Sequence, residues 1–177
     1  MQSKVKIDLG CGKTKPEGFI GIDIAAGDGV DIVHDLGQGI PMEDSSVDYV
    51  RAYDFVEHLP NKLNTMNEIW RVLKPGGTAE IFVPSTEGSG AFQDPTHVSF
   101  WNKNSFLYFT TEVKAYLELG QKYGFKGTFN LIKFVTLVKG KPWNEFGYFE
   151  KRSIIKETLF KMQSPIVHHH VILECVK

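Results

Sequence analysis

The sequence predicts an α/β fold built on a mostly parallel β-sheet, and two observations lead to this prediction. Short apolar runs rich in Val and Ile alternate with turn residues through the first half of the chain, as in parallel strands that are buried on both faces. Residues 61–73 carry apolar side chains at helical spacing. Because strands that alternate with helices build a parallel sheet, we expect any ligand at the carboxyl ends of the strands.

The predicted elements of the first half follow one another with short connections. Strands are expected at residues 5–9, 19–24, 31–34, 47–52 and 78–83. The helix of residues 61–73 ends at residues 74–77, where Pro and paired Gly cannot continue it. Residues 13–18 contain Pro and Gly and are too few for a full crossover helix, so we expect a loop there.

The second half of the chain is less regular. A long loop is expected at residues 85–103, a helix at 104–123, and strands at 128–138 and 166–176. Between these strands, residues 139–163 contain Gly, Pro and aromatic residues followed by a short predicted helix at 151–162. Long loops in compact domains are commonly functional, which directs attention to residues 85–103. We find no repeat or linker, so one domain is expected over residues 1–177.

The bulk composition narrows the class of protein. A formal net charge of −1 argues against a nucleic-acid partner. No apolar run is long enough to span a bilayer, and none at the start of the chain resembles a signal peptide. The two cysteines, Cys11 and Cys175, provide no disulfide framework and fit a reducing compartment. We therefore expect a cytoplasmic protein without a membrane partner.

Two motifs at neighbouring predicted strand ends indicate a nucleoside site. The run Asp8-Leu9-Gly10-Cys11-Gly12 follows the first strand, and glycines there let the backbone approach a ligand closely. Asp23 ends the second strand within Gly21-Ile22-Asp23-Ile24, where a carboxylate can accept both hydroxyls of a ribose. The alternative is a tight turn beside a solvated Asp.

Further motifs appear in order along residues 5–84: Asp35-Leu36, Asp48-Tyr49-Val50 running to Glu57-His58-Leu59, and Leu73-Lys74-Pro75-Gly76-Gly77. With the two motifs above, the chain resembles the class I S-adenosylmethionine-dependent methyltransferases, in particular the compact type 11 group. The resemblance implies a Rossmann-like three-layer sandwich with a mostly parallel, seven-stranded sheet and an antiparallel closing hairpin. It also implies S-adenosyl-L-methionine as cofactor, a cofactor-binding half at residues 1–84, and an acceptor loop, helix and closing strands at 85–177.

The resemblance assigns roles around the first two strands. Gly10, Cys11 and Gly12 would wrap the methionine part of the cofactor, with Asp8 helping to hold that loop. Asp23 would bind the ribose hydroxyls, and Ile24 would pack on the adenine.

The resemblance also assigns roles after the third and fourth strands. Asp35 would accept a hydrogen bond from the adenine amino group, and Leu36 would offer its backbone N–H. Asp54 would lie near the methionine ammonium or the transferred methyl group. For Asp35 the alternative is a helix or turn cap, and for Asp54 it is the N-cap of a helix that begins at Phe55.

The acceptor side of the reaction needs alignment and, for a protonated acceptor, a base. His97 and Asp94 lie in the long loop after the fifth strand and could face the acceptor. We expect His97 to act as the base or to orient the acceptor, with His58 and Asp94 as further catalytic candidates. A structural hydrogen bond is the alternative for each histidine.

Three further patterns leave alternatives open. Asp54, Glu57 and His58, with His97 as a distant fourth ligand, could hold a divalent ion as some family members with a similar segment do. Because the loop offers no second clear carboxylate, we predict no metal site.

The run His168-His169-His170 is interpreted as an ordinary closing strand that sends its first and third members to one face. Aromatic residues line either an acceptor pocket or the core: Phe92, Phe100, Trp101, Phe106, Tyr108 and Phe109.

The sequence thus predicts a methyltransferase that acts on a small-molecule or glycan acceptor. A non-catalytic cofactor-binding subunit and an NAD or nucleotide-sugar enzyme are the alternatives. The short first crossover weakens the NAD alternative, because a pyrophosphate depends on a helix N-terminus at that place. A homodimer is left open.

Overall fold

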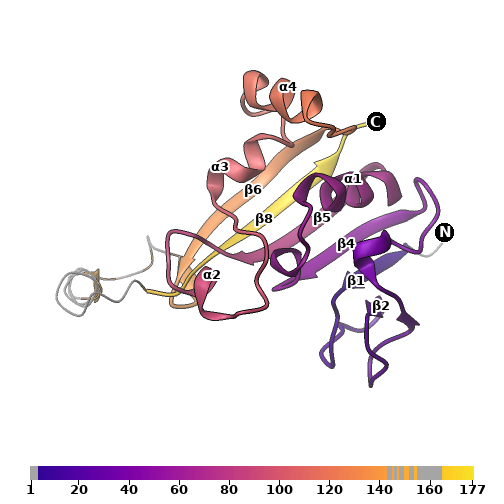
Figure 1. Ribbon diagram of the computed structural model, residues 1–177, viewed down its shortest axis with the longest axis horizontal. Coiled ribbons are helices and arrows are strands. Elements are labelled where there is room, and N and C mark those ends of the chain that lie inside the picture. The colour runs from indigo at the N-terminus through magenta and orange to yellow at the C-terminus, as the bar shows by residue number, and fades with distance from the viewer. Residues whose placement is uncertain (1–3, 143–144, 146, 148–149, 152–153, 155–164) are drawn as a thin grey trace.

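Eight strands form one continuous sheet in the order β3-β2-β1-β4-β5-β8-β6-β7 (Figure 1). The parallel strands are β1 (Lys6–Leu9), β2 (Ile20–Asp23), β3 (Ile32–Val33), β4 (Val47–Tyr53) and β5 (Leu73–Pro84). The antiparallel strands are β6 (Phe129–Val138), β7 (Lys141–Pro142) and β8 (Val167–Cys175). The computed structural model describes residues 4–142, 145, 147, 150–151, 154 and 165–177. The helix predicted at residues 151–162 lies almost wholly outside these residues.

The predicted Rossmann-like α/β class, with its antiparallel closing strands, is confirmed. The sheet has eight strands where seven were predicted, because a tight turn adds β7. Lys139 and Gly140 both have positive φ, 49° and 85°, and they join Val138 to its partner Lys141. Two consecutive residues of this kind make a type I′ turn, whose twist matches that of a hairpin.

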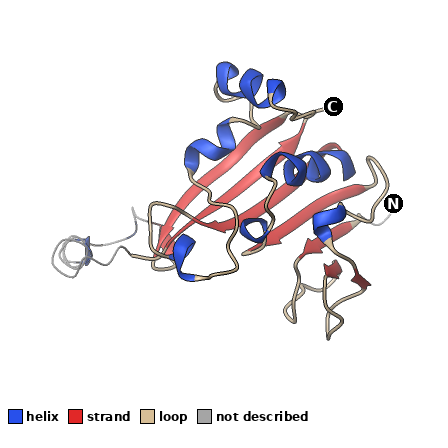
Figure 2. Ribbon diagram, in the orientation of Figure 1, coloured by secondary structure: helices blue, strands red, loops and turns tan. Residues whose placement is uncertain are grey.

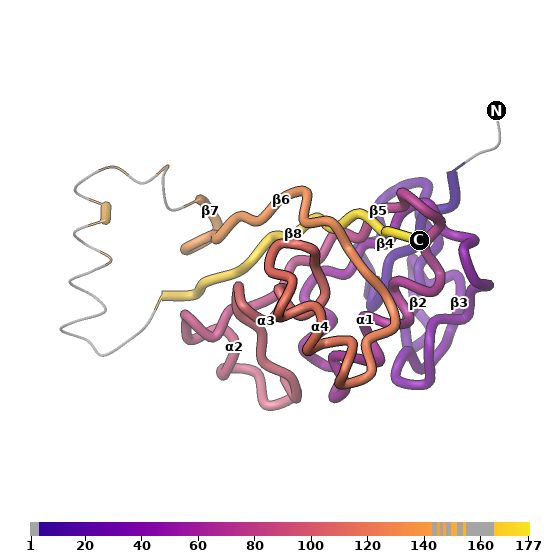
Figure 3. The backbone as a smooth tube through the Cα atoms, turned by 90° about the horizontal axis from the view of Figure 1, so that it is seen from above, coloured from indigo at the N-terminus to yellow at the C-terminus, as the bar shows by residue number. Residues whose placement is uncertain are grey.

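The longer helices all lie on one side of the sheet. α1 (Lys62–Val72), α3 (Lys103–Leu107) and α4 (Lys114–Lys122) stand on the same side in two perpendicular views (Figures 1 and 3). The crossovers after β1 and β2, residues 10–19 and 24–31, are loops, as predicted for the first of them. Figure 2 shows these loops beside the short strands at the edge of the sheet. None of the helices in the described residues is long and apolar enough to cross a membrane.

Helix α1 begins at a side-chain cap and ends where β5 begins. The Asn61 side chain caps it by accepting a hydrogen bond from the Asn64 N–H at 3.0 Å, which contributes about 1 kcal/mol. Met66, Ile69 and Val72 occupy its buried face. The helix ends at Val72, and the next residue already begins β5, two residues before the Pro-Gly-Gly segment.

The single helix predicted at residues 104–123 is wrong: α3 and α4 are separate. Between them the chain pairs with β6, where Phe129 N–H donates to Phe109 O and Thr111 N–H donates to Phe129 O, both at 3.0 Å. Thr110 forms an isolated bridge to Phe129. This pairing also buries Phe106 and Phe109. Helical spacing continued across the break, so the sequence pattern did not reveal it.

The parallel strands end at one edge of the sheet because they pair in register. Leu9 pairs with Ile22 on one side and with Ala52 on the other, and Tyr53 pairs with Phe82. The connections after these strands therefore begin side by side. The segment of residues 85–103 starts at the same edge and contains a short helix, α2 (Gly90–Gln93). A bridge between Ser85 and Trp101 closes the segment on itself.

A buried histidine makes the stability of this fold depend on pH. His169 is 0% exposed on β8, beside the Phe134 ring, and its Nε2 has no hydrogen-bond partner. Burial lowers its pKa from 6.5 to about 4. The unfolded chain therefore binds a proton as the pH falls below 6.5 while the folded protein does not, and stability is lost between these two pKa values.

We predict that the free energy of unfolding falls by about 2 kcal/mol between pH 7.5 and pH 5 through His169 alone. Because Phe cannot titrate, the free energy of unfolding of His169→Phe should fall by about 2 kcal/mol less than that of the wild type between these two pH values. Urea unfolding at both pH values measures the difference. His34→Ala, at a half-buried histidine after β3, is the control and should keep the full loss. An equal pH dependence in the wild type and in His169→Phe would contradict the prediction.

Candidate functional site

A glycine bend follows β1 at the carboxyl edge of the sheet. Gly10 and Gly12 have φ of 63° and 52°, a conformation that residues with a Cβ rarely adopt. The Gly10 N–H donates to Ile22 O at 2.9 Å, which ties the bend to β2. A Cβ at Gly10 would stand 2.2 Å from Cδ2 of Phe55, so only glycine fits there. At Gly12, by contrast, nothing lies within 4 Å of the position that a Cβ would take, so this part of the bend leaves its backbone open.

Asp23 holds the glycine bend. Its Oδ2 accepts a hydrogen bond from the Gly12 N–H at 3.0 Å, and its Oδ1 accepts from Ala25 N–H at 3.3 Å. A carboxylate has about four lone-pair sites, so Asp23 can still accept hydroxyl donors from a ligand. The two predicted motifs are therefore joined directly through this one side chain.

Asp8 does not hold the loop, which corrects its predicted role. It lies on β1 with its side chain on the face that carries Arg51, and it accepts from Arg51 Nη1 at 2.7 Å. Asp8 is 1% exposed, and burial raises its pKa despite the guanidinium. The pair ties β1 to β4 beneath the bend. Cys11, in the bend itself, is also buried, and burial raises the pKa of its thiol.

The residues predicted to contact adenine lie on the next two strand ends. Ile24 is 70% exposed, which leaves an apolar surface free directly after Asp23. Asp35 caps the short helix η1 (Leu36–Gln38) by accepting from Gly37 N–H at 2.9 Å, so the alternative role as a cap is present in the structure. Leu36 is buried and lines an apolar pocket with Leu9 and Phe55.

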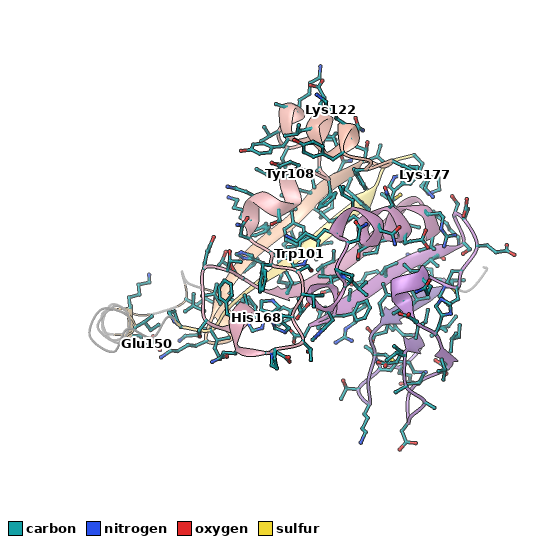
Figure 4. The ribbon with its side chains drawn as sticks, in the orientation of Figure 1. Trp101, Tyr108, Lys122, Glu150, His168 and Lys177 are labelled. Carbon is teal, nitrogen blue, oxygen red and sulfur yellow. The ribbon has the colours of Figure 1, made fainter. Side chains whose placement is uncertain are left out.

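Asp54 occupies a strained position at the end of β4. Its φ is 46°, although it is not glycine, and such strain concentrates at functional sites. The N-cap of the following short helix, η2 (Val56–His58), is Phe55, so the predicted alternative of Asp54 as N-cap is wrong. The Asp54 side chain is 56% exposed and its Oδ1 lies 3.4 Å from His168 Nε2. Figure 4 shows His168 at the end of the sheet where β8 begins.

Three side chains on the acceptor side form one cluster, Glu57-His58-His97. Nε2 of His97 lies 3.8 Å from Oε1 of Glu57, and the two imidazole rings lie 4.9 Å apart between centroids. Glu57 is 1% exposed, and neither of its carboxylate oxygens has a hydrogen-bond partner. Burial raises the pKa of this carboxyl to about 7. Glu57 and His97 are thus brought together from segments 40 residues apart.

Backbone carbonyls orient the two imidazoles. Nδ1 of His97 lies 3.0 Å from Ala91 O, and Nδ1 of His58 lies 3.2 Å from Thr96 O. Asp94 fixes Thr96 by accepting from its N–H at 2.7 Å and its hydroxyl at 2.6 Å. These bonds lower the pKa of Asp94. Asp94 therefore shapes the loop around His58, while a direct catalytic role for it stays a prediction.

The aromatic residues near the long loop divide into two groups. Trp101, Phe106 and Phe109 are at most 2% exposed and belong to the core, and Tyr108 packs against that core. Phe92 and Phe100 are 62% and 41% exposed, and their rings stack with centroids 5.1 Å apart. Only this stacked pair can meet an acceptor at the surface.

The structure also brings in residues that the sequence did not indicate. Ala91 and Thr96 act through backbone carbonyls, which no residue pattern reveals. His168 reaches Asp54 because β8 begins opposite the end of β5, where it pairs with Pro84. The sequence does send His168 and His170 to one face, as predicted, and His170 bonds Glu80 there. The pairing register of β5 with β8, if known from the sequence, would have predicted the contact between His168 and Asp54.

The fold is Rossmann-like, and its carboxyl edge carries a glycine bend that a carboxylate braces. The family model described as a methyltransferase domain matches residues 7–81. Squalene methyltransferase 2 of Botryococcus braunii is 29% identical over 72% of this chain and 34% of its own length. A probable S-adenosylmethionine-dependent methyltransferase of Mycolicibacterium smegmatis is 38% identical over 32% of this chain and 22% of its own. The solved YcgJ protein of Bacillus subtilis, 13% identical, shares the fold with a TM-score of 0.62 over 98% of this chain and 92% of that one.

Over residues 7–81 the chain is thus similar to a methyltransferase domain, and it shares the fold of a solved S-adenosylmethionine-dependent methyltransferase of Archaeoglobus fulgidus. The chain spans about a third or less of the two curated relatives. The cosubstrate of the family is S-adenosyl-L-methionine, and the residues at the edge fit it. The positive-φ glycines would admit close approach of the methionine part, the Asp23 carboxylate would accept from ribose hydroxyls, and exposed Ile24 would offer adenine an apolar face.

We predict that Asp23→Ala weakens binding of S-adenosylhomocysteine by roughly tenfold or more, because a charge-assisted hydrogen bond and the brace on the glycine bend are both lost. Isothermal titration calorimetry measures the change. Asp23→Asn keeps one oxygen that can accept a hydrogen bond, so its affinity should lie between those of the wild type and of Asp23→Ala. Asp28→Ala, at an exposed carboxylate in the same crossover, is the control. Unchanged affinity in Asp23→Ala, or an equal loss in the control, would refute the assignment.

Proposed function

We propose that this chain transfers the methyl group of S-adenosyl-L-methionine to a small-molecule acceptor at the carboxyl edge of the sheet. The observation that carries the proposal is the glycine bend braced by Asp23, since it combines close backbone approach with a carboxylate at a strand end. The sulfonium supplies an already activated methyl group. The protein therefore has to align the acceptor and manage its proton.

The surface beside the Glu57-His58-His97 cluster favours an acceptor with an apolar part. Phe92, Val98 and Phe100 are 62%, 52% and 41% exposed on the segment that also carries His97. Leu63 and Pro60 line a shallow groove with Val98 and Phe100. The name of one relative points to squalene, an apolar hydrocarbon, as its acceptor. A small molecule with an apolar ring or chain thus suits this surface better than a purely polar glycan.

The two histidines are the groups that would act on the acceptor. Because both Nδ1 atoms face carbonyl oxygens, each neutral ring keeps its lone pair on Nε2. His97 or His58 can therefore accept a proton from the acceptor or orient it through Nε2. Asp54, beside His168, would lie toward the methionine end, as the family resemblance implies.

The alternatives to this function find less support. A bound pyrophosphate requires a helix N-terminus after β1, whereas residues 10–19 form a loop. Nothing in the arrangement favours a non-catalytic subunit over an enzyme. From the sequence we predict a cytoplasmic protein that has no nucleic-acid or membrane partner. A homodimer is left open by the same analysis of the sequence.

We predict that His97→Ala slows methyl transfer by roughly 10²–10⁴-fold and leaves the affinity for S-adenosylhomocysteine within about twofold, because His97 lies outside the glycine bend. The rate is measured as S-adenosylhomocysteine formed with an acceptor found by screening apolar hydroxylated and amino compounds. His34→Ala is the control and should keep the wild-type rate. A fully active His97→Ala protein would remove this residue from the mechanism. No turnover with any acceptor, at intact cosubstrate binding, would count against the enzyme assignment.

Phe92→Ala should raise the KM for the acceptor about tenfold with kcat little changed, because it removes apolar contact of about 1–2 kcal/mol in binding. Steady-state kinetics with the acceptor varied measure the effect. Tyr123→Ala, another exposed aromatic but on the far side of α4, is the matched control. An unchanged KM, or an equal rise in the control, would show that the acceptor binds elsewhere.

A further inference from the structure

We propose that Glu57, His58 and His97 form a binding site for one divalent transition-metal ion, with Zn²⁺ as the representative ligand. The inference departs from the sequence prediction of no metal site. It does not depend on the proposed methyl transfer, since metal binding can be measured without an acceptor.

The first observation is the environment of the Glu57 carboxylate. The side chain is 2% exposed, and neither oxygen accepts a hydrogen bond from any group. Buried carboxylates are ordinarily hydrogen-bonded, paired with a cation or bound to a metal. Within the described residues, His97 approaches Glu57 to 3.8 Å, beyond hydrogen-bond distance, and His58 lies in the same cluster without a hydrogen bond to the carboxylate. The carboxylate is therefore placed for a positive ligand that the protein chain itself does not supply.

The second observation is the hydrogen bonding that orients the two imidazoles. A carbonyl oxygen only accepts, so Ala91 O fixes the proton of His97 on Nδ1. The Thr96 carbonyl oxygen likewise accepts from Nδ1 of His58. The Thr96 hydroxyl also lies near this nitrogen, but it cannot donate to it because its hydrogen is donated to Asp94. In the neutral tautomer with Nδ1–H, each ring offers the lone pair of Nε2. A metal-bound histidine is oriented in this way, with its other ring N–H donated to a backbone carbonyl.

The third observation is convergence. One ligand atom from each of the three side chains lies within 4.8 Å of the other two. Ligands bound at about 2 Å from one ion lie roughly 3–4 Å apart, so small rotations complete the site. The backbone holds the two halves together, because Val98 N–H and Ser99 N–H both donate to Glu57 O at 3.0 and 2.9 Å.

The donor set selects the kind of ion. Two imidazoles and one carboxylate suit Zn²⁺, Co²⁺ or Fe²⁺, whereas Mg²⁺ and Ca²⁺ prefer oxygen ligands throughout. Three protein ligands leave at least one coordination position for water or for an acceptor oxygen. With the ion bound, His97 serves as a ligand rather than as a proton acceptor. Asp54, which the sequence grouped with Glu57 and His58, lies instead beside His168.

Titration of the chelator-treated protein with Zn²⁺ tests the site. We expect one saturable site per chain in the wild type, and affinity lowered at least 100-fold in Glu57→Gln and in His97→Ala. His34→Ala, which removes a histidine outside the cluster, should bind as the wild type does. Thermal unfolding of each variant without metal checks that it is folded. Lack of saturable binding in the wild type, or equal affinity in a folded His97→Ala protein, would overturn the proposal.

A second measurement uses the unaltered protein and remains decisive if the variants fail to fold. Addition of Co²⁺ should produce two paramagnetically shifted, exchangeable imidazole N–H signals in the proton spectrum, one from each Nδ1–H held by a carbonyl. Fewer than two such signals would show that the two histidines do not share the ion. Retention of an unshifted spectrum would mean that Glu57 and His97 form a metal-free pair.

Discussion

The in-register pairing of β1 with β2 and β4 is the constraint on which the carboxyl edge of the sheet depends. It sets Gly10, Asp23 and Asp54 at a single edge, although they come from three separate stretches of sequence. With the strand ends level, a single carboxylate can brace the glycine bend from the neighbouring strand. A slip of one residue between β1 and β2 would send Asp23 to the opposite face and leave the bend unsupported.

The acceptor side is held by a different means. A long segment after β5 returns to the backbone of η2 and places His97 over Glu57. The sheet contributes only the starting point of that segment, at Ser85. Loops positioned by a rigid scaffold commonly carry specificity, and here the loop brings two exposed aromatic rings and an imidazole to the same edge. The sheet would thus position the cosubstrate, and a loop would position the acceptor.

The sequence predicted most elements of the first half well because short apolar runs and glycine motifs report local structure. The strands β1 to β4, α1 and the loop after β1 were expected within a few residues of where they lie, whereas β5 begins at Leu73, five residues before its predicted start. The break between α3 and α4 escaped prediction because it comes from pairing with β6, a contact distant in sequence. The role of Asp8 was misjudged for a similar reason, since Arg51 reaches it from another strand. The burial of Glu57 likewise follows from tertiary packing, which cannot be predicted from the presence of a polar residue in the sequence.

The crossovers after β1 and β2 are loops where helices would otherwise stand, and this has a consequence for how the edge behaves. A helix would hold its own shape through internal hydrogen bonds, whereas a loop of this kind draws much of its order from what it contacts. The bend thus depends on tertiary contacts, such as those of Gly10 with Ile22 and of Gly12 with Asp23. A bound nucleoside would supply the missing order and stabilise the folded state in proportion to the logarithm of its concentration. In this chain the cosubstrate would act as a structural component of the lobe that holds it.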